Sequence, residues 1–405
     1  MQKKLFSFII LFFLFTTNVF ASQLNLESEK YILYNLKDNE VLLEKDSHVE
    51  TNIASLTKMM TVIVAIENIE DFNEKVTITR EMIKDIESDV AVAGFKVGNK
   101  VTYNDLLYAS LLVSGADAVN ALAYSISGSE KEFVKLMNLK AKELNLKNTN
   151  FTNVTGLYNS NHYSSAYDMA ELLKYAIKNE KFKEVFQKDT YRTTNGLDFN
   201  STRVSYSNFG VDMSNVTGSK TGYIKKAGYC LASTGIIEDI PFLLITLNAY
   251  DNSNGNPAIN DTVHIYDYFE DNYSYKTIVN TEDSLYELDT IFAKEDKYDI
   301  VSPKEIVKYV KKDFKPEDID IEYSGEKAVS SLMINNFKLG KVTIKYNDEL
   351  IYEFDAKYDK SLNIDYVKLI LEYKYYIAGA IVLLILVIII KVNIKKKRRY
   401  ALYGN

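Results

Sequence analysis

The sequence is poor in the residue types on which several classes of protein depend. It has one cysteine, Cys230, so no disulfide can form within the chain, and only three histidines, His48, His162 and His264. No H-E-x-x-H or comparable pair, no G-x-S-x-G, no Walker loop and no G-x-G-x-x-G occurs. A net charge of −7 argues against a nucleic-acid partner. We therefore expect no metal and no cofactor, and a hydrolase built on this chain would take its general base from a lysine or a carboxylate.

The N-terminus has the layout of a secretory signal. A short basic start, "MQKK", precedes the apolar run "LFSFIILFFLF", and the small residues Val19 and Ala21 follow. This pattern predicts a signal peptide over residues 1–21, with an uncleaved anchor helix as the alternative. In either case the body of the protein is exported, and with a single cysteine it does not rely on cross-links.

The C-terminus carries a second membrane signal. Residues 375–390 are uncharged, and the predicted membrane helix over residues 373–392 has about the ~20 residues that a span requires. Six lysines and arginines follow between positions 391 and 399, which marks the cytoplasmic side. A buried core helix is the alternative. We expect a single-pass membrane protein with an extracellular body and a basic cytoplasmic tail, residues 393–405.

Between the two membrane signals, helical and strand patterns alternate along the chain. The 3.6-residue periodicity and short alternating runs predict an α+β (α/β) fold, in which helices cover a sheet. Helices are expected over 54–69, within 103–148 and over 165–179, and strands within 31–46 and 216–250. The sequence pattern changes near residue 276. Residues 276–366 are rich in charge and contain short alternating runs, which predicts a small β-rich domain with a hairpin turn at "YNDEL".

Ser55 and Lys58 stand at the head of a segment that is apolar on nearly every side. Positions i and i+3 of a helix share a face, so the hydroxyl and the amine can come within hydrogen-bonding distance. Apolar neighbours such as Met59 and Ile63 would desolvate the lysine and favour its neutral form, which can accept the serine proton. The alternative role for Ser55 is a helix cap. The pattern is weak by itself, because "SGEK" at 324–327 matches it too.

Two further motifs make the pattern specific. The only K-T-G of the chain, Lys220-Thr221-Gly222, lies where β-type sequence begins, and a strand edge of this composition suits a peptide that ends in a carboxylate. Ser114 begins "SGAD" in a turn between two predicted helices. An S-x-x-K, a serine-containing middle motif and a K-T-G, in this order, are the signature of penicillin-binding proteins and class A β-lactamases.

With these motifs the chain resembles the serine-type D-alanyl-D-alanine carboxypeptidases, the low-molecular-weight penicillin-binding proteins of the bacterial cell wall. The similar stretches include "ASLTKMMT", "YNDLLYASLLVSGADAVNALA", "HYSSAYDMAELL" and "GSKTGYIKKAGYCLAS". The resemblance implies a catalytic domain over residues 22–275 with an antiparallel sheet flanked by helices. It also implies removal of the terminal D-alanine from peptidoglycan stem peptides, acylation by β-lactams, a contribution to cell shape, and a bacterial cell-membrane location.

The resemblance also assigns roles to residues that match the motifs. Ser55 would be the acylated nucleophile, Lys58 its general base, and Ser114 a proton shuttle to the leaving D-alanine. Lys220 and Thr221 would hold the terminal carboxylate on the K-T-G strand, which includes Gly222. The backbone N–H groups of Ser55 and Tyr223 would form the oxyanion hole. Structural roles are expected for His162, Asp168 and Cys230.

The chain departs from the family pattern in the middle motif. Ala116 occupies the position where the family usually has an asparagine, and Asn120, one turn further on, is a candidate substitute. Two alternatives remain open at this point. A class A β-lactamase would need a deacylating E-x-x-L-N glutamate, which the sequence lacks. A non-catalytic homologue that binds cell-wall peptide is the other.

Overall fold

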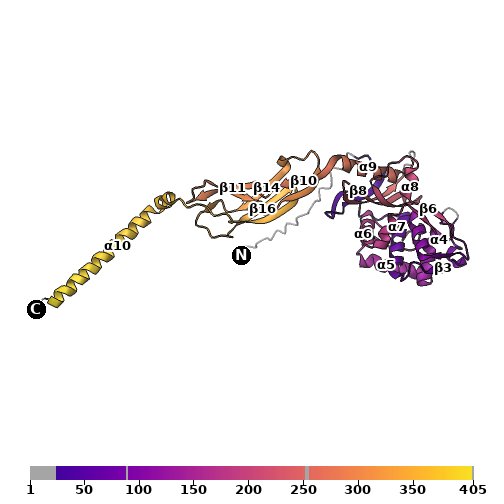
Figure 1. The fold of residues 1–405 in the computed structure, drawn as a ribbon, viewed down its shortest axis with the longest axis horizontal. Coiled ribbons are helices and arrows are strands. Elements are labelled where there is room, and N and C mark those ends of the chain that lie inside the picture. The colour runs from indigo at the N-terminus through magenta and orange to yellow at the C-terminus, as the bar shows by residue number, and fades with distance from the viewer. Residues whose placement is uncertain (1–23, 88–89, 251–254, 404–405) are drawn as a thin grey trace, which may run out of the picture. The chain divides into compact units, whose positions relative to one another are not determined.

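The computed structural model describes residues 24–87, 90–250 and 255–403 (Figure 1). The chain divides into two compact units, Met1–Asp271 and Asn272–Asn405, which are described separately below. The predicted signal peptide, residues 1–21, lies outside the described residues.

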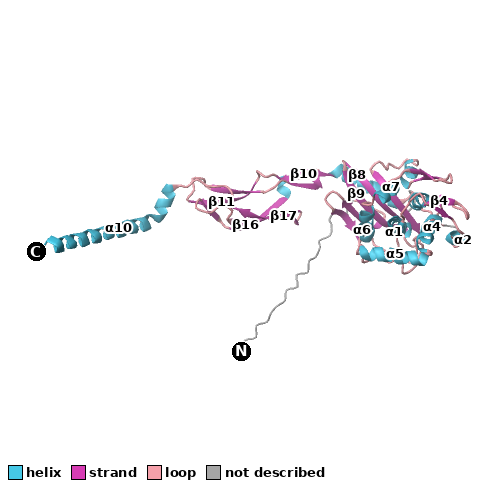
Figure 2. Cartoon of the chain, turned by 60° about the horizontal axis from the view of Figure 1, so that its bottom comes forward, coloured by secondary structure: helices cyan, strands magenta, loops and turns pink. Residues whose placement is uncertain are grey.

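The first unit is built on a five-stranded sheet in which every neighbouring pair of strands is antiparallel (Figure 2). The sheet order is β2 (Glu40–Lys45), β1 (Ser28–Asn35), β9 (Ile240–Ala249), β8 (Gly228–Ile237) and β7 (Val216–Ile224). Strands β8 and β9 are buried almost throughout and rich in apolar residues, as expected for strands covered on both faces. The K-T-G strand, β7, lies at one edge of the sheet.

Helices cover both faces of this sheet, which confirms the predicted α+β fold. On one face α6 (Ala166–Ala176) packs against β1 and β9, and α1 (Thr57–Asn68) packs behind it. On the other face lies α9 (Pro257–Asn272), which no sequence pattern had indicated. Polar contacts fix α9 there: Asp261 accepts two hydrogen bonds from Ser28, and Tyr266 bonds to the hydroxyl of Ser233 at 3.0 Å.

The remaining elements of this unit surround α1. They are α2 (Arg80–Ile83), α3 (Tyr103–Leu112), α4 (Ala116–Ser127), α5 (Glu130–Glu143), α7 (Glu180–Phe186), α8 (Thr202–Ser207) and the hairpins β3 (Lys75–Thr77) with β4 (Lys100–Thr102) and β5 (Thr190–Arg192) with β6 (Asp198–Asn200). Side-chain caps set several helix starts, as Thr102 does for α3 and Ser129 for α5. Residues 57–66 of α1 are all buried, so this helix is the centre of the core.

The second unit is β-rich, as predicted. Its strands are β10 (Tyr273–Val279), β11 (Ser284–Ile291), β12 (Lys297–Val301), β13 (Ile306–Lys311), β14 (Ile319–Gly325), β15 (Ala328–Ser330), β16 (Lys338–Tyr346) and β17 (Glu349–Lys357). The predicted hairpin joins β16 to β17 through Asn347 and Asp348, whose positive φ angles of 50° and 65° suit a two-residue turn. The unit ends in α10 (Tyr366–Tyr403), the one helix within the described part of the chain that is long and apolar enough to cross a membrane.

Candidate active site

The segment that carries Ser55 has an unusual backbone. The helix predicted over 54–69 begins only at Thr57, because a short 3-10 turn, η2 (Ala54–Leu56), precedes α1. Ser55 therefore lies just before the α-helix and not within its first turn. Ala54 has a φ of 47°, which is rare for a residue with a Cβ atom. Gly156 makes this conformation possible, because a Cβ there would lie 1.9 Å from the carbonyl oxygen of Ala54. The turn is therefore held in place by tertiary contacts.

Lys58 is directed at Ser55 from a buried position. Its Nζ donates a hydrogen bond to the Ser55 Oγ at 2.8 Å, as expected, and a second to the carbonyl oxygen of Thr155 at 2.8 Å. The side chain is 1% exposed. Burial lowers the pKa of Lys58 to about 7, although the negative charge of Asp117 acts in the opposite direction. A substantial fraction of Lys58 is therefore neutral near pH 7 and able to accept a proton.

Ser114 lies in the turn between α3 and α4 with a φ of 59°. The turn is tied to residues 91–95: Ala116 N–H donates to the carbonyl oxygen of Ala91, and Asp117 accepts three backbone N–H groups at 2.8–2.9 Å. Both α3 and α4 pack against α1, and the Asp117 charge acts on Lys58. This packing brings the middle motif close to the Ser55–Lys58 pair.

Strand β7 brings the K-T-G motif to the same place. A Cβ atom on Gly222 would lie 3.0 Å from the backbone nitrogen of Ser55, so glycine allows the edge strand to pack directly against η2. Lys220 is 1% exposed, and both burial and the charge of Lys58 lower its pKa well below the usual value. Thr221 is half-buried, and the Tyr223 side chain is exposed and packs on the ring of Tyr229.

A chain of hydrogen bonds that the sequence did not indicate supports the nucleophile segment. His162 Nδ1 accepts from the backbone N–H of Thr152 at 3.1 Å, so its Nε2 carries the proton toward Thr57 Oγ1 at 2.8 Å. Thr57 Oγ1 in turn donates to the carbonyl oxygen of Ala54 at 2.8 Å. Burial lowers the pKa of His162 to about 4, so the ring stays neutral. This chain, and the Thr155 carbonyl, act through backbone atoms, which no sequence pattern reveals.

Other singled-out residues have structural places. Asp168 accepts from the N–H of Asn148 and the hydroxyl of Thr149 at the start of α6. Cys230 is free and buried, and burial raises the pKa of its thiol to about 12. The second S-x-x-K, at 324–327, begins within the last two residues of β14 and starts no helix.

Ala116 is fully buried at the start of α4, where the family usually has asparagine. Asn120, the candidate substitute, has a buried Oδ1 without a hydrogen-bond partner within residues 24–87, 90–250 and 255–403. The proposal that Asn120 takes over the missing role stays a prediction.

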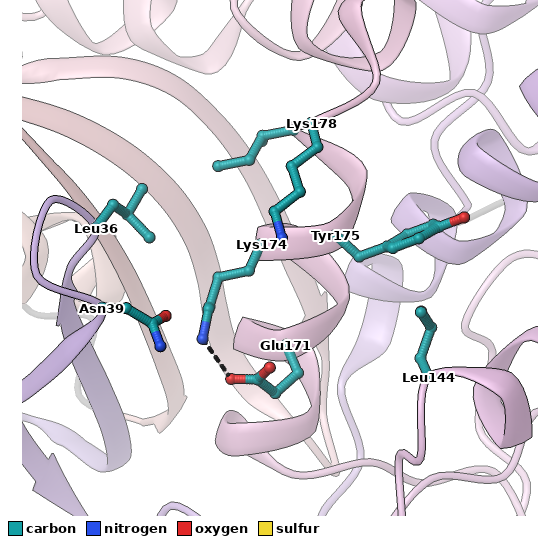
Figure 3. A pocket seen from close by; sticks show the side chains of 8 residues that line it. Leu36, Asn39, Leu144, Glu171, Lys174, Tyr175 and Lys178 are labelled. Atoms are coloured by element: carbon teal, nitrogen blue, oxygen red, sulfur yellow. Dashed lines mark hydrogen bonds and ion pairs between the residues drawn. The ribbon is translucent and has the colours of Figure 1, made fainter.

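A separate hollow of about 570 Å³ lies between the β1–β2 turn and α6 (Figure 3). Lys174 and Glu171 form an ion pair at 2.8 Å inside it, and Leu36 and Tyr175 contribute to its wall. None of the predicted site residues lines it. No group of three His, Cys, Asp or Glu side chains in the described ranges could hold a metal ion.

The fold, the Ser55–Lys58 pair and the K-T-G strand packed against it define a serine peptidase of the penicillin-recognising type. Residues 17–251 match the D-alanyl-D-alanine carboxypeptidase family, peptidase family S11. The chain is 29% identical to the D-alanyl-D-alanine carboxypeptidase DacF of Bacillus subtilis, over 82% of this chain and 85% of DacF. It is 34% identical to the carboxypeptidase DacA of Escherichia coli, over 52% and 53% of the two chains.

The solved structure of penicillin-binding protein 5 from Haemophilus influenzae has the same fold, with a TM-score of 0.60 at 21% identity, over 84% of this chain and 98% of that one. The chain therefore belongs to the D-alanyl-D-alanine carboxypeptidase family and is a serine-type carboxypeptidase. The family acts on peptidoglycan peptides, and its members are penicillin-binding proteins. This match favours the carboxypeptidase over the β-lactamase alternative.

Proposed function

We propose that Ser55 is the nucleophile of this carboxypeptidase and that neutral Lys58 is its general base. The observation that carries the proposal is the 2.8 Å hydrogen bond between a buried lysine of lowered pKa and a serine at a constrained turn. Lys58 takes the hydroxyl proton while the Ser55 Oγ attacks the carbonyl carbon of the penultimate D-alanine. The backbone N–H groups of Ser55 and Tyr223 stabilise the oxyanion.

The rest of the reaction uses the middle motif and water. Ser114 passes the proton from Lys58 to the amine of the departing D-alanine, which leaves Ser55 in an ester with the stem peptide. Water then attacks the ester, Lys58 accepts a proton from that water, and Lys58 passes this proton to the Ser55 Oγ as that oxygen leaves. A β-lactam would acylate Ser55 by the first half of the same sequence. Asn120 takes the role of the missing asparagine.

Substrate binding depends on β7, the strand at one edge of the sheet. The peptide lies beside the strand, close to Gly222, with its terminal carboxylate at Lys220 and Thr221. A carboxylate beside Lys220 raises the lowered pKa of that amine, because an opposite charge favours the protonated form. The buried lysine therefore becomes charged when the substrate arrives, which favours peptides with a free C-terminus.

The location follows from the two ends of the chain. The apolar helix α10 anchors the protein in the cell membrane, and the six basic residues after position 390 stay in the cytoplasm. The signal at residues 1–21 exports the body, so the catalytic unit faces the cell wall. If carbonate or high salt released the intact protein from membranes, this topology would be wrong.

The test uses the full chain with Ser55→Ala and the control Ser324→Ala, which removes the serine of the second S-x-x-K. Labelling by a fluorescent penicillin and release of D-alanine from diacetyl-Lys-D-Ala-D-Ala are measured together. We expect both to vanish in Ser55→Ala and to persist in Ser324→Ala. Labelling without release in the unsubstituted protein would identify a weakly active homologue and implicate Ala116. Equal activity of both variants would exclude Ser55 as the nucleophile.

A further inference from the structure

Two loops of the second unit expose apolar side chains beside the start of α10. One comprises the last residue of β11 and the two residues after it, 291–293, and the other is residues 331–337; together they are called the base loops here. Ile334 is 75% exposed and Leu332 is 52% exposed, and Ile291 and Phe337 are exposed as well. Met333, between the first two, points inward and packs on the core of the unit. The core of the unit is therefore filled beneath this loop, and the exposed apolar side chains of the loop are additional to it.

Hydrogen bonds tie the base loops to each other and to the head of α10. The Ser331 N–H and Oγ donate to the carbonyl oxygens of Ile291 and Phe292, at 3.0 and 2.6 Å. The Asp365 N–H also donates to Phe292 O, and Lys368 Nζ donates to Ala293 O at 3.0 Å. Residues 291–293 are thus fixed beside the first turn of the helix, and the 331–337 loop is fixed to residues 291–293.

The contact of Phe292 shows at which position along α10 these loops lie. Its ring lies 5.7 Å from that of Tyr373, two residues before the uncharged run 375–390 begins, which corresponds to roughly 3 Å of helix rise. Phe292 also has a φ of 58°, which is rare for an aromatic residue and is held by the two bonds to its carbonyl. Tyr373, Tyr375 and Tyr376 are of the type that marks the interface between membrane and water.

We propose that the base loops rest on the bilayer, with Leu332 and Ile334 inserted among the lipid headgroups. The inference rests on the proposed insertion of α10. Since the level of Tyr373 is that of the interface, side chains fixed beside it meet lipid and not bulk water. Charged neighbours of the loops are of both signs, for example Lys294 beside Glu295, so the contact is apolar and does not require anionic lipid. A second contact of this kind restricts the tilting of the β-rich unit about the head of α10.

The sequence offers a direct test because it contains no tryptophan. Ile334→Trp, in the full chain, introduces a single reporter at an exposed site. The matched control is Leu350→Trp, at the opposite end of the β16–β17 hairpin, where the side chain is likewise exposed, at 59%. Strand β16 has nine residues, so the two sites lie roughly 25 Å apart along the hairpin. Ile385→Trp, inside the uncharged run, reports on α10 itself.

Each protein is reconstituted into phosphatidylcholine vesicles, with ordinary lipid or with lipid brominated near the headgroup end of the acyl chains. Ile385→Trp is also measured in chain-brominated lipid, which carries its bromine near the middle of the acyl chains. We expect bromine to reduce the emission of Ile334→Trp about twofold, as for a tryptophan at the interface, and to leave Leu350→Trp unchanged. Leu332→Trp should behave as Ile334→Trp does, which guards against a local folding defect. Thermal melting checks that all variants are folded.

The outcomes separate the two proposals. If Ile385→Trp is quenched by chain-brominated lipid while Ile334→Trp and Leu332→Trp match Leu350→Trp, the anchor stands and the contact of the base loops is wrong. If Ile385→Trp is not quenched either, α10 is outside the membrane and both proposals are wrong. Equal quenching of Ile334→Trp and Leu350→Trp would mean that the unit lies flat on the membrane, which also contradicts a contact confined to the base loops.

Discussion

Lys58 and Lys220 come from different elements, yet the positive charge of Lys58 helps to lower the pKa of Lys220. Both side chains are almost completely buried, so neither charge is well screened by water. Two amines in this situation titrate as a pair, because protonation of one makes protonation of the other less favourable. The proposed roles need opposite protonation states, because Lys58 acts when neutral and Lys220 binds a carboxylate when charged. The carboxylate of the bound substrate favours this arrangement, since it raises the pKa of Lys220.

The pH dependence of acylation is the first prediction. Below its pKa of about 7, Lys58 is protonated and cannot accept the serine proton. The rate constant for penicillin acylation should therefore fall about tenfold for each pH unit below 7. It should fall again on the alkaline side, below the ordinary lysine range, as Lys220 loses its charge. A rate that is unchanged between pH 5.5 and 8 would contradict Lys58 as the base.

A substitution of Asp117 should shift the pH dependence of acylation. Its charge raises the pKa of Lys58 against the effect of burial, so Asp117→Asn should move the acid limb to lower pH. The carboxylate also accepts the backbone N–H groups of Ala93, Gly94 and Phe95, and the amide would present a donor to some of them. We expect a loss of roughly 1–3 kcal/mol in stability, seen as a lower melting temperature. A shift of the acid limb to higher pH would contradict the electrostatic argument.

Much of the architecture could be predicted because it follows from local pattern. The strands on either side of the turn at 36–39, the helices α3 to α6 and the strands β7 to β9 all lie where periodicity placed them. The turn at Asn347 and Asp348 was predictable because these residue types tolerate a positive φ. Helix α9 was missed, since its charged residues obscure an apolar face that is only completed by packing on the sheet.

The site was predictable in its side chains and not in its backbone. Ser55, Lys58 and Lys220 could be found because each belongs to a sequence motif whose residue types indicate its chemistry. The positive φ of Ala54 could not, since it depends on Gly156, a hundred residues away. The link from His162 through Thr57 to Ala54 was missed for the same reason. Contacts made by backbone carbonyl groups, and close packing of one backbone against another, do not depend on a particular residue type, so no sequence motif indicates them.

Gly222 should be intolerant of even the smallest side chain. Alanine would place a Cβ 3.0 Å from the backbone nitrogen of Ser55 and 3.1 Å from the Cβ of Ala54, so β7 must move away from the nucleophile. Small displacements of this kind weaken catalysis strongly, and we expect Gly222→Ala to slow penicillin acylation about tenfold or more. Gly379→Ala is the control, because a Cβ there meets nothing within 4 Å. If Gly222→Ala acylates as fast as Gly379→Ala, close packing of β7 is not required.

Thr57 tests whether the hydrogen-bond chain from His162 positions the nucleophile. Thr57→Val keeps the shape of the side chain but leaves the Ala54 carbonyl and the His162 Nε2–H without their partner. Two buried groups left unpaired should cost roughly 1–3 kcal/mol each, which lowers the melting temperature. Ala54 is then freer to leave its φ of 47°, so acylation should slow as well.

Thr57→Ser is the matched variant, since it retains the hydroxyl and loses only a methyl group. We expect it to restore most of the acylation rate, while Thr57→Val stays slow at every pH because the pKa of Lys58 is set by burial and not by this chain. The measurement is the rate constant for fluorescent penicillin from pH 6 to 9, together with the melting temperature. Should Thr57→Val melt lower but acylate as fast as Thr57→Ser, the chain stabilises the fold and does not position Ser55.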